Sequence, residues 1–191
     1  MGGIEVVRMR ILFNVAHPAQ VHLFRNALQT LMDHGHECRI TAINKEVSLK
    51  LLDSFGFDYD AIGRARPTPF GKGLELLRID AKLLQIARSF HPDLLVGGVG
   101  NAYVAHVGKL IRKPSIIFDD TEHAAIQHHL TDPFVSAICT PSCYTKDLGE
   151  KQVRYNGYHE LAYLHPNRFT PNPDVLTELD LAEGDPFIIV R

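Results

Sequence analysis

The sequence predicts an α/β fold in which helices cover both faces of a doubly wound, mostly parallel sheet. Short apolar segments of strand-like composition alternate along the chain with segments whose apolar residues recur at helical spacing. The strand-like segments are continuous apolar runs, as expected for strands buried on both faces. Because such sheets bind ligands beyond the carboxyl ends of their strands, the residues that follow each strand become the candidate site.

The first three strands and the helices between them occupy the part of the chain that starts at Met9. Met9 directly precedes the first strand-like run, so residues 1–8 are interpreted as an extension. Each helix of this part ends at a glycine, Gly35 or Gly56. In chain order the expected elements are a strand at 10–16, a helix at 21–33, a strand at 37–43, a helix that carries Val47, Leu51 and Phe55, and a strand at 57–62.

The middle of the chain continues the alternation after a region without regular structure. Residues 63–73 are rich in proline and glycine and predict a long surface loop. The elements expected after this loop are a helix at 74–90, a strand at 94–96, a helix of small residues at 101–111, a strand at 115–118, a short helix toward Leu130, and strands at 137–140 and 153–156.

The last residues indicate the beginning of a second domain. Residues 166–173 have the composition of a linker, residues 175–179 predict a helical turn, and residues 186–191 predict a strand with no partner strand in this chain. The expected organisation is therefore an extension at 1–8, one Rossmann-like domain at 9–165, and a linker with the start of a truncated carboxy-terminal domain at 166–191.

Composition favours a small-molecule partner. The formal net charge is −2 and the Lys and Arg residues are scattered, which argues against nucleic acid and acidic membranes. No apolar run approaches the roughly 20 residues of a membrane helix, and no signal peptide precedes the first strand, so a cytoplasmic protein is expected. The three cysteines, Cys38, Cys139 and Cys143, are too few for a disulfide framework and lack zinc-site spacing, so no metal is expected.

Two strand–helix junctions carry groups with useful chemistry. His17 follows the first strand, where an imidazole suits a general base that takes a proton from a hydroxyl; helix capping or loop packing is the alternative. The sequence GGVGN at 97–101 places Gly98, Gly100 and Asn101 where backbone N–H groups can bind an anion or substrate oxygens; a tight turn is the alternative. The dinucleotide fingerprint is absent after the first strand, so NAD and FAD are not expected.

The strongest local signal is a group of acids and a histidine after the fifth strand. Asp119, Asp120, Glu122 and His123 could share protons or bind substrate hydroxyls, whereas helix capping is the competing interpretation. A later run at 154–165 adds further polar and aromatic groups. In it, Asn156, His159 and Glu160 could line a cleft between domains or act as a hinge; ordinary surface packing is the alternative.

Four motifs together resemble a prokaryotic family of unknown function whose members are described as predicted glycosyltransferases. They are ILFNVAHPAQVH, FDDTEHA, AICTPSC followed by KDLG, and RYNGYHELAYLHP, and the resemblance spans most of residues 9–191. This family is similar to GT-B glycosyltransferases and to the non-hydrolysing UDP-GlcNAc 2-epimerases, whose two Rossmann-like domains enclose the substrate. The resemblance implies that the chain is a GT-B amino-terminal domain and that the missing half holds most of the nucleotide.

The expected function follows from the resemblance and these residues together. The full-length protein is expected to transfer a sugar from a nucleotide-sugar donor to an acceptor of unknown identity, without a metal or cofactor, and this chain alone is expected to be inactive. The alternatives are an enzyme like the UDP-sugar 2-epimerases and a non-catalytic module that binds sugars or nucleotides; homo-oligomers are left open. The expected catalytic groups are His17, Asp119 and Glu122, and the expected substrate-binding groups are Gly98, Gly100, Asn101, Asp120, His123, Asn156, His159 and Glu160.

Overall fold

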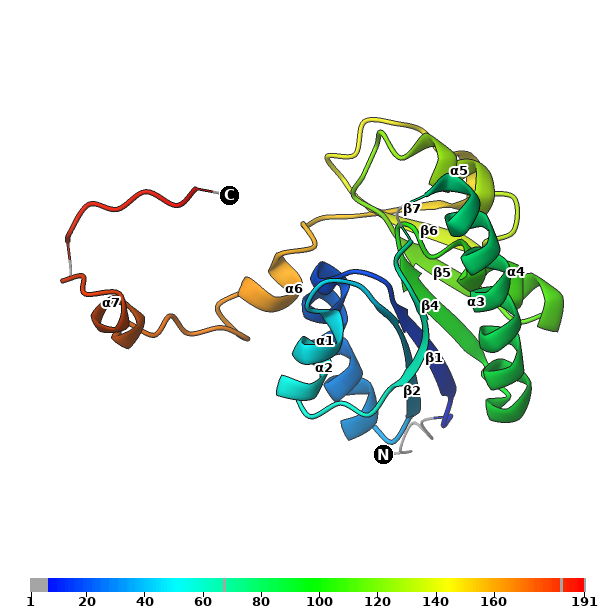
Figure 1. The fold of residues 1–191 in the computed structure, drawn as a ribbon, viewed down its shortest axis with the longest axis horizontal. Helices are drawn as coiled ribbons and strands as arrows, with labels where there is room; N and C mark the ends of the chain where they lie inside the picture. The colour runs from blue at the N-terminus through cyan, green and yellow to red at the C-terminus, as the bar shows by residue number, and fades with distance from the viewer. Residues whose placement is uncertain (1–6, 67, 183, 191) are drawn as a thin grey trace, which may run out of the picture.

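The computed structural model describes residues 7–66, 68–182 and 184–190, and in them one sheet runs through the middle of the domain (Figure 1). All of its neighbouring strands are parallel, in the order β3-β2-β1-β4-β5-β6-β7. This confirms the predicted Rossmann-like, doubly wound sheet. The strands are β1 (Arg10–Val15), β2 (Glu37–Asn44), β3 (Asp60–Arg64), β4 (Leu94–Gly98), β5 (Ser115–Phe118), β6 (Ala137–Pro141) and β7 (Gln152–Tyr155).

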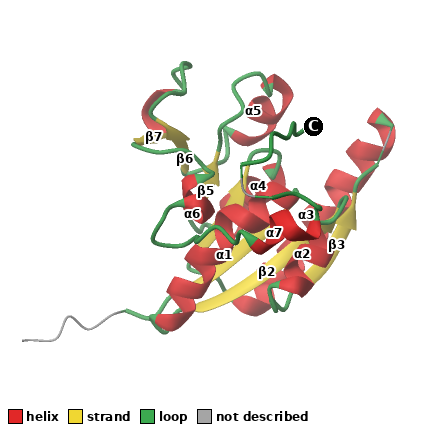
Figure 2. Ribbon diagram, turned by 90° about the vertical axis from the view of Figure 1, so that its left-hand side faces the viewer, coloured by secondary structure: helices red, strands yellow, loops and turns green. Residues whose placement is uncertain are grey.

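Helices lie on both faces of the sheet, with α1 and α2 on one side and α3 and α4 on the other (Figure 1). The small helix α6 packs on α1 (Figure 2). The helices are α1 (Pro18–Asp33), α2 (Ser48–Ser54), α3 (Pro69–Phe90), α4 (Ala102–Ile111), α5 (Ala125–Thr131), the 3₁₀ turn η1 (Gly149–Lys151), α6 (Leu161–Leu164) and α7 (Asp174–Glu178).

Strand β1 contributes to two hydrophobic cores because successive strand residues point to opposite faces. Leu12 packs with Leu83 of α3 in one core, whereas Phe13 packs with Phe24 of α1 in the other. These side chains are almost fully buried. Burial of each one contributes about 1.5–3 kcal/mol relative to exposure, so β1 is held rigidly between the two helical layers.

The strand order reverses between β1 and β4. The chain moves outward from β1 through β2 to β3 and then returns to place β4 on the other side of β1. The helices that follow these two strands, α1 and α4, consequently leave toward opposite faces (Figure 1). A crevice between such diverging helices is the general ligand site of open α/β sheets.

Three local predictions need correction. Most of the predicted loop at 63–73 is regular structure, because β3 extends to Arg64 and α3 begins at Pro69, where the Thr68 hydroxyl accepts a hydrogen bond from the Gly71 N–H and proline suits the first helical turn. Helix α1 starts at Pro18, not Val21, for the same reason. Helix α2 is shorter than the expected helix, so that Val47 and Phe55 flank it.

The tail differs from its prediction as well. The predicted helical turn is present as α7, but residues 186–190 form neither helix nor strand, because no other described strand lies beside them to exchange hydrogen bonds. Their apolar side chains are largely exposed, reaching 91% at Val190. Residues 1–6 of the predicted extension and Arg191 lie outside the described residues. The domain boundaries at 8 and 165 stay predictions.

Candidate functional site

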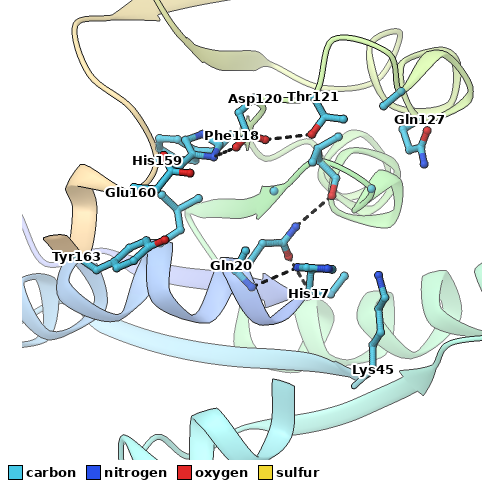
Figure 3. A pocket seen from close by; sticks show the side chains of 17 residues that line it. His17, Gln20, Lys45, Phe118, Asp120, Thr121, Gln127, His159, Glu160 and Tyr163 are labelled. Carbon is cyan, nitrogen blue, oxygen red and sulfur yellow. Dashed lines mark hydrogen bonds and ion pairs between the residues drawn. The ribbon is translucent and has the colours of Figure 1, made fainter. Parts of the chain in front are cut away.

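A pocket of about 470 Å³ lies at the point where the strand order reverses, and we call it the switch pocket. Its walls come from the residues that follow β1, β2, β4 and β5 and from the segment after β7. Figure 3 shows His17 and Gln20 on the side of α1, with Asp120 and His159 across from them. Its lining is made of Ala16, His17, Ala19, Gln20, Leu23, Lys45, Gly98, Val99, Gly100, Phe118, Asp120, Thr121, Ala124, Gln127, His159, Glu160 and Tyr163.

Gln20 joins the ends of β1 and β4 beneath this pocket. Its Oε1 accepts hydrogen bonds from the Ala16 N–H at 2.8 Å and from Asn101 Nδ2 at 3.2 Å, and its Nε2 donates to the Val99 carbonyl at 3.0 Å. The side chain is 95% buried, so these bonds satisfy polar groups that water cannot reach. A Cβ at Gly98 would lie 2.4 Å from Gln20 Nε2, and only glycine leaves room for this connection.

His17 is the N-cap of α1 and lines the switch pocket. Its Nδ1 accepts a hydrogen bond from the Ala19 N–H at 3.2 Å. A neutral imidazole that accepts at Nδ1 carries its proton on Nε2. In this arrangement the Nε2–H of His17 is a hydrogen-bond donor. The capping interpretation of His17 is therefore confirmed, and its catalytic role stays a prediction.

Asp120 and His159 are joined by a hydrogen bond in the opposite wall. His159 Nδ1 lies 3.0 Å from Asp120 Oδ2, and this hydrogen bond lowers the pKa of the Asp120 carboxyl despite the opposing effect of burial. The His159 ring stacks on Tyr155, with a centroid distance of 6.3 Å and an interplanar angle of 9°. Its Nε2 is buried and has no hydrogen-bond partner among the described residues. Glu160, the next residue, also lines the pocket.

The neighbouring Asp119 faces away from the switch pocket. Successive residues in extended backbone point in opposite directions, so Asp119 and Asp120 separate. Asp119 is 98% buried, accepts a hydrogen bond from the Thr121 N–H at 2.7 Å, and lies 3.4 Å from both His128 Nε2 and the Tyr144 hydroxyl. Burial raises the pKa of this carboxyl more than its partners lower it. The predicted catalytic candidate Asp119 thus belongs to an internal polar network.

Glu122 also lies outside the switch pocket. Its carboxylate accepts hydrogen bonds from the backbone N–H and hydroxyl of Thr145, and its carbonyl accepts one from Lys146. The hydrogen bonds from Thr145 lower the pKa of Glu122. The structure places Glu122 in the wall of a neighbouring hollow of about 200 Å³, which shares Asp120, His159 and Glu160 with the lining of the switch pocket. A carboxylate held in this way joins two loops, and it lies beside the switch pocket without lining it.

Three predicted substrate-binding residues do not line the switch pocket either. His123 and Asn156 are exposed at other places on the surface. Asn101 is fully buried and donates from Nδ2 to the Asn14 carbonyl at 3.0 Å and to Gln20. It therefore supports the floor of the pocket, one step behind the lining. Gly98 and Gly100 do line the pocket, and the φ of +88° at Gly100 explains why glycine is needed in this turn.

Several lining residues were not identified from the sequence. Gln20 had a local signal, because it stands three residues after the N-cap His17, the spacing at which a side chain reaches back to the start of a helix. For Lys45 the only indication in the sequence was its position just after β2. Tyr163 was part of the run at 154–165, but nothing in that run indicated that α6 would turn it toward α1.

The described part of the chain contains no group of three or more His, Cys, Asp or Glu side chains placed to hold a metal ion. The three cysteines are free thiols. Among the described residues, no helix is both long enough and apolar enough to span a lipid bilayer.

A family described as "Protein of unknown function (DUF354)" matches residues 9–191, and the chain belongs to this family. The resemblance stated from the sequence motifs is thereby confirmed. No curated protein matches the sequence.

Solved structures share the fold at low sequence identity. The glycosyltransferase SsfS6 from Streptomyces sp. SF2575 has a TM-score of 0.59 at 15% identity, over 78% of this chain and 56% of its own. The UDP-GlcNAc 2-epimerase from Methanocaldococcus jannaschii has a TM-score of 0.58 at 12% identity, over 70% of this chain and 40% of its own. MnaA from S. aureus, solved with UDP, has a TM-score of 0.65 at 10% identity, over 90% and 51%.

These likenesses concern the fold. The chain has the Rossmann-like architecture of GT-B glycosyltransferases and UDP-GlcNAc 2-epimerases. It covers 40–56% of the length of the three proteins compared, which is about half of each.

Proposed function

We propose that this member of the family of unknown function acts on a nucleotide sugar at the switch pocket and that its full-length protein transfers the sugar to a hydroxyl of an acceptor. In this proposal the chain forms the acceptor side. The observation that carries it is the presence of two imidazoles on opposite walls of one pocket, each with its Nδ1 engaged: that of His17 accepts from the Ala19 N–H, and that of His159 faces Asp120. Sugar transfer needs both a donor for developing negative charge and a base for the acceptor hydroxyl.

The pair of Asp120 and His159 supplies the base. Asp120 accepts from Nδ1 of His159, which leaves Nε2 as the proton acceptor when the ring is neutral. A carboxylate that fixes the tautomer of an imidazole is a general arrangement for activating a hydroxyl. The unpartnered state of Nε2 supports this role, since a buried imidazole nitrogen ordinarily has a hydrogen-bond partner, and an acceptor hydroxyl would be one.

His17, the first catalytic candidate from the sequence, takes the complementary role. Its Nδ1 is engaged with the Ala19 N–H, so its Nε2–H is directed to a substrate oxygen that gains negative charge as the sugar is transferred. The amino terminus of α1, which has no acidic residue in its first turn, favours negative charge at the same place. Removal of one such donor typically costs about 10²–10³-fold in kcat.

A second candidate reaction is the epimerisation of a UDP-sugar. The placement of two imidazoles on opposite walls of the pocket favours it as well. His17 and the Asp120–His159 pair lie on opposite walls, as a reaction that removes and returns a proton on two faces of one sugar requires. The shared fold with UDP-GlcNAc 2-epimerases makes the comparison relevant. This reaction predicts interconversion of UDP-sugars without an acceptor.

Calorimetric titration with UDP, GDP and several of their sugars is the first test, performed on this chain and on the full-length protein that contains it. Binding by the full-length protein is expected, with weaker binding by this chain because the second half holds most of the nucleotide. Absence of nucleotide-sugar binding by the full-length protein would contradict the proposal and favour a non-catalytic role.

Single substitutions then test the two imidazoles in the full-length protein. His159→Gln should lower the rate of sugar transfer by about 10²–10⁴-fold with little change in substrate affinity, because it removes the base. His17→Asn should lower the rate while preserving the helix cap. His129→Gln is the control, since His129 is exposed and outside the pocket. Equal rates in all four proteins would overturn the catalytic assignment.

A further inference from the structure

A second pocket, of about 390 Å³, lies on the same edge of the sheet where β2 and β3 end, and we call it the basic pocket. Lys45 follows β2, Arg64 ends β3, and α3 contributes side chains from its first turns. Four of the charged side chains that line this pocket are cations and one is a carboxylate: Lys45, Arg64, Arg66, Lys72 and Glu75. Four cations around one pocket repel one another, so their balance by other groups decides whether the pocket favours an anion.

The carboxylate does not neutralise the basic pocket. Glu75 is buried, with its side chain 7% exposed, and it accepts hydrogen bonds from the Arg64 N–H and from Arg66 Nε, each at 3.2 Å. Burial alone would raise the pKa of Glu75, but these hydrogen bonds and the charges of Arg66 and Arg78 lower it, so the carboxylate stays ionised. It thereby balances one cation and fixes the direction of the Arg66 side chain.

The remaining cations are poorly balanced. Within the described ranges no carboxylate lies at ion-pair distance from Arg64 or Lys72. Lys45 has one contact of this kind, with its exposed neighbour Glu46 at 3.8 Å. An exposed pair of adjacent residues contributes little to balancing charge. The lining therefore has an excess of positive charge.

The position of these cations on α3 makes the excess more unusual. The basic pocket adjoins the amino terminus of α3, which has no acidic residue in its first turn and where Lys72 lies. The helix dipole is positive at this end and disfavours cations. Like charges gathered at such a place cost free energy, and a bound anion would remove this cost by satisfying the guanidinium and ammonium groups.

A second basic hollow adjoins the opposite end of a helix. It lies at the carboxyl terminus of α4, where the dipole favours cations, and it is lined by Lys109, Arg112, Lys113 and Lys151. There Lys113 pairs with Asp93 at 3.2 Å, and Lys151 donates to the Asp132 carbonyl at 2.6 Å. Lys109 and Arg112 have no ion pair among the described residues, so the two hollows differ in the helix end they adjoin: the dipole of α4 favours its cations, whereas that of α3 does not.

We propose that the basic pocket binds the phosphate or diphosphate group of a phosphorylated acceptor. Lys45 lines both pockets and extends toward the side of the switch pocket where His17 lies (Figure 3). An anion held in the basic pocket therefore sits beside a substrate in the switch pocket. Guanidinium groups such as those of Arg64 and Arg66 match the geometry of phosphate oxygens. This inference rests on the proposed transfer function, because it names the class of its second substrate.

Calorimetry with inorganic pyrophosphate tests the anion site in the full-length protein. The double variant Arg64→Gln/Lys72→Gln should raise the dissociation constant at least about tenfold, because charge-assisted hydrogen bonds are lost. The matched control Lys109→Gln/Arg112→Gln removes the same charges at the other basic hollow and should stay within about twofold of the wild type. Circular dichroism melting checks that each variant folds. Equal affinity of the wild type and the Arg64/Lys72 variant overturns the proposal.

Vesicle flotation distinguishes the two sources of such a phosphate. If the wild type floats with phosphatidylcholine vesicles that carry phosphatidic acid and the Arg64/Lys72 variant does not, a lipid-linked acceptor is supported. Pyrophosphate binding that depends on these residues, without flotation, supports a soluble phosphorylated acceptor. Vesicles of phosphatidylcholine alone are the control for binding that does not require the phosphate.

Nucleotide-sugar affinity separates this proposal from the transfer function. The Arg64/Lys72 variant should bind a UDP-sugar within about twofold of the wild type, because neither residue lines the switch pocket. A wild-type protein that binds pyrophosphate through these residues but no nucleotide sugar contradicts the transfer function and leaves the anion site supported. If the wild type binds the nucleotide sugar but the wild type and the Arg64/Lys72 variant bind pyrophosphate with equal affinity, only the proposed anion site is contradicted.

Discussion

Single residues connect the segments that follow the two central strands beneath the switch pocket. Gln20 reaches from the first turn of α1 to the backbone on both sides of the strand reversal. It can do so only because Gly98 has no side chain. The shape of the pocket floor therefore depends on one buried amide and one glycine, neither of which is a reacting group.

The substitution Gly98→Ala should destabilise the domain by about 1–3 kcal/mol, because a methyl group would force Gln20 out of its hydrogen bonds and leave buried polar groups unsatisfied. Urea denaturation of the chain measures this change. Gly73→Ala is the matched control, since Gly73 lies in α3 with nothing within 4 Å of a new Cβ. It should stabilise the protein by about 0.5–1 kcal/mol. A Gly98→Ala protein as stable as the wild type would show that Gln20 can move at no cost.

The residue scale also explains which site residues could be predicted from the sequence. Position after a strand was enough to identify His17, Gly98 and Asp120, because all strand ends of a parallel sheet meet at one edge. It could not separate Asp119 from Asp120, since the phase of alternation at a strand end depends on tertiary packing. The pairing of Asp120 with His159 joins distant segments and had no local signal.

At the scale of elements, one histidine connects three helices. His106 of α4 lies 3.1 Å from Asp80 of α3 through Nδ1 and 2.9 Å from the Leu130 carbonyl of α5 through Nε2. Because a carboxylate and a carbonyl both accept, both ring nitrogens are placed to donate, and this arrangement favours the charged form of the imidazole. The hydrogen bond with Asp80 is the main reason that the pKa of His106 is raised above its usual value.

A pH dependence of stability follows from this contact. A raised pKa in the folded state stabilises the protein fully below the unfolded pKa of about 6.5, and this contribution is lost as the pH rises through the folded pKa. Asp80→Asn should therefore lower the free energy of unfolding by about 1 kcal/mol near pH 6 and by less in alkaline solution. Urea titrations across this range measure the difference.

Asp58→Asn serves as the control for the same substitution, because Asp58 is exposed. It should leave the free energy of unfolding within about 0.5 kcal/mol of the wild type at every pH. A difference between wild type and Asp80→Asn that does not shrink as the pH rises would show that the charge of His106 is not involved.

The boundaries of elements were harder to predict than their order. The α3 start was assigned to a loop because its glycines and prolines usually interrupt structure, although proline at a first helical position after a threonine cap is a helix-start signal. Helix α2 is shorter than the expected helix: Val47 and Phe55 flank it, and Leu51 packs against the core from within it.

At the scale of the whole molecule, the order of strand and helix segments was enough to predict the sheet. Continuous apolar strands separated by helices permit few arrangements, and right-handed crossovers reduce them further. The tail lacked such constraints. A strand forms only where a second strand exchanges backbone hydrogen bonds with it, and residues 186–190 have no such partner strand among the described residues. Its assignment to a second domain remains a prediction, which the contacts of the tail allow to be tested.

The contacts between tail and domain are concentrated around α6. Asn26 of α1 donates to the Ala162 carbonyl at 2.7 Å, and Arg168 lies 3.3 Å from the Thr30 hydroxyl. Beyond Thr170 no described residue is buried. Since exposed side chains contribute little to folding free energy, the residues after 170 should be dispensable for the stability of the domain.

Removal of residues 171–191 should change the Tm by no more than about 2 °C, because a loss under about 0.5 kcal/mol corresponds to that shift in a domain of this size. Removal of residues 158–191 should lower the Tm by several degrees more, since it also deletes His159, Tyr163 and the contact of α6 with α1. Thermal unfolding followed by circular dichroism distinguishes the two truncations. If the shorter deletion is as damaging as the longer one, residues 171–191 belong to the folding unit and the predicted boundary at 165 is misplaced.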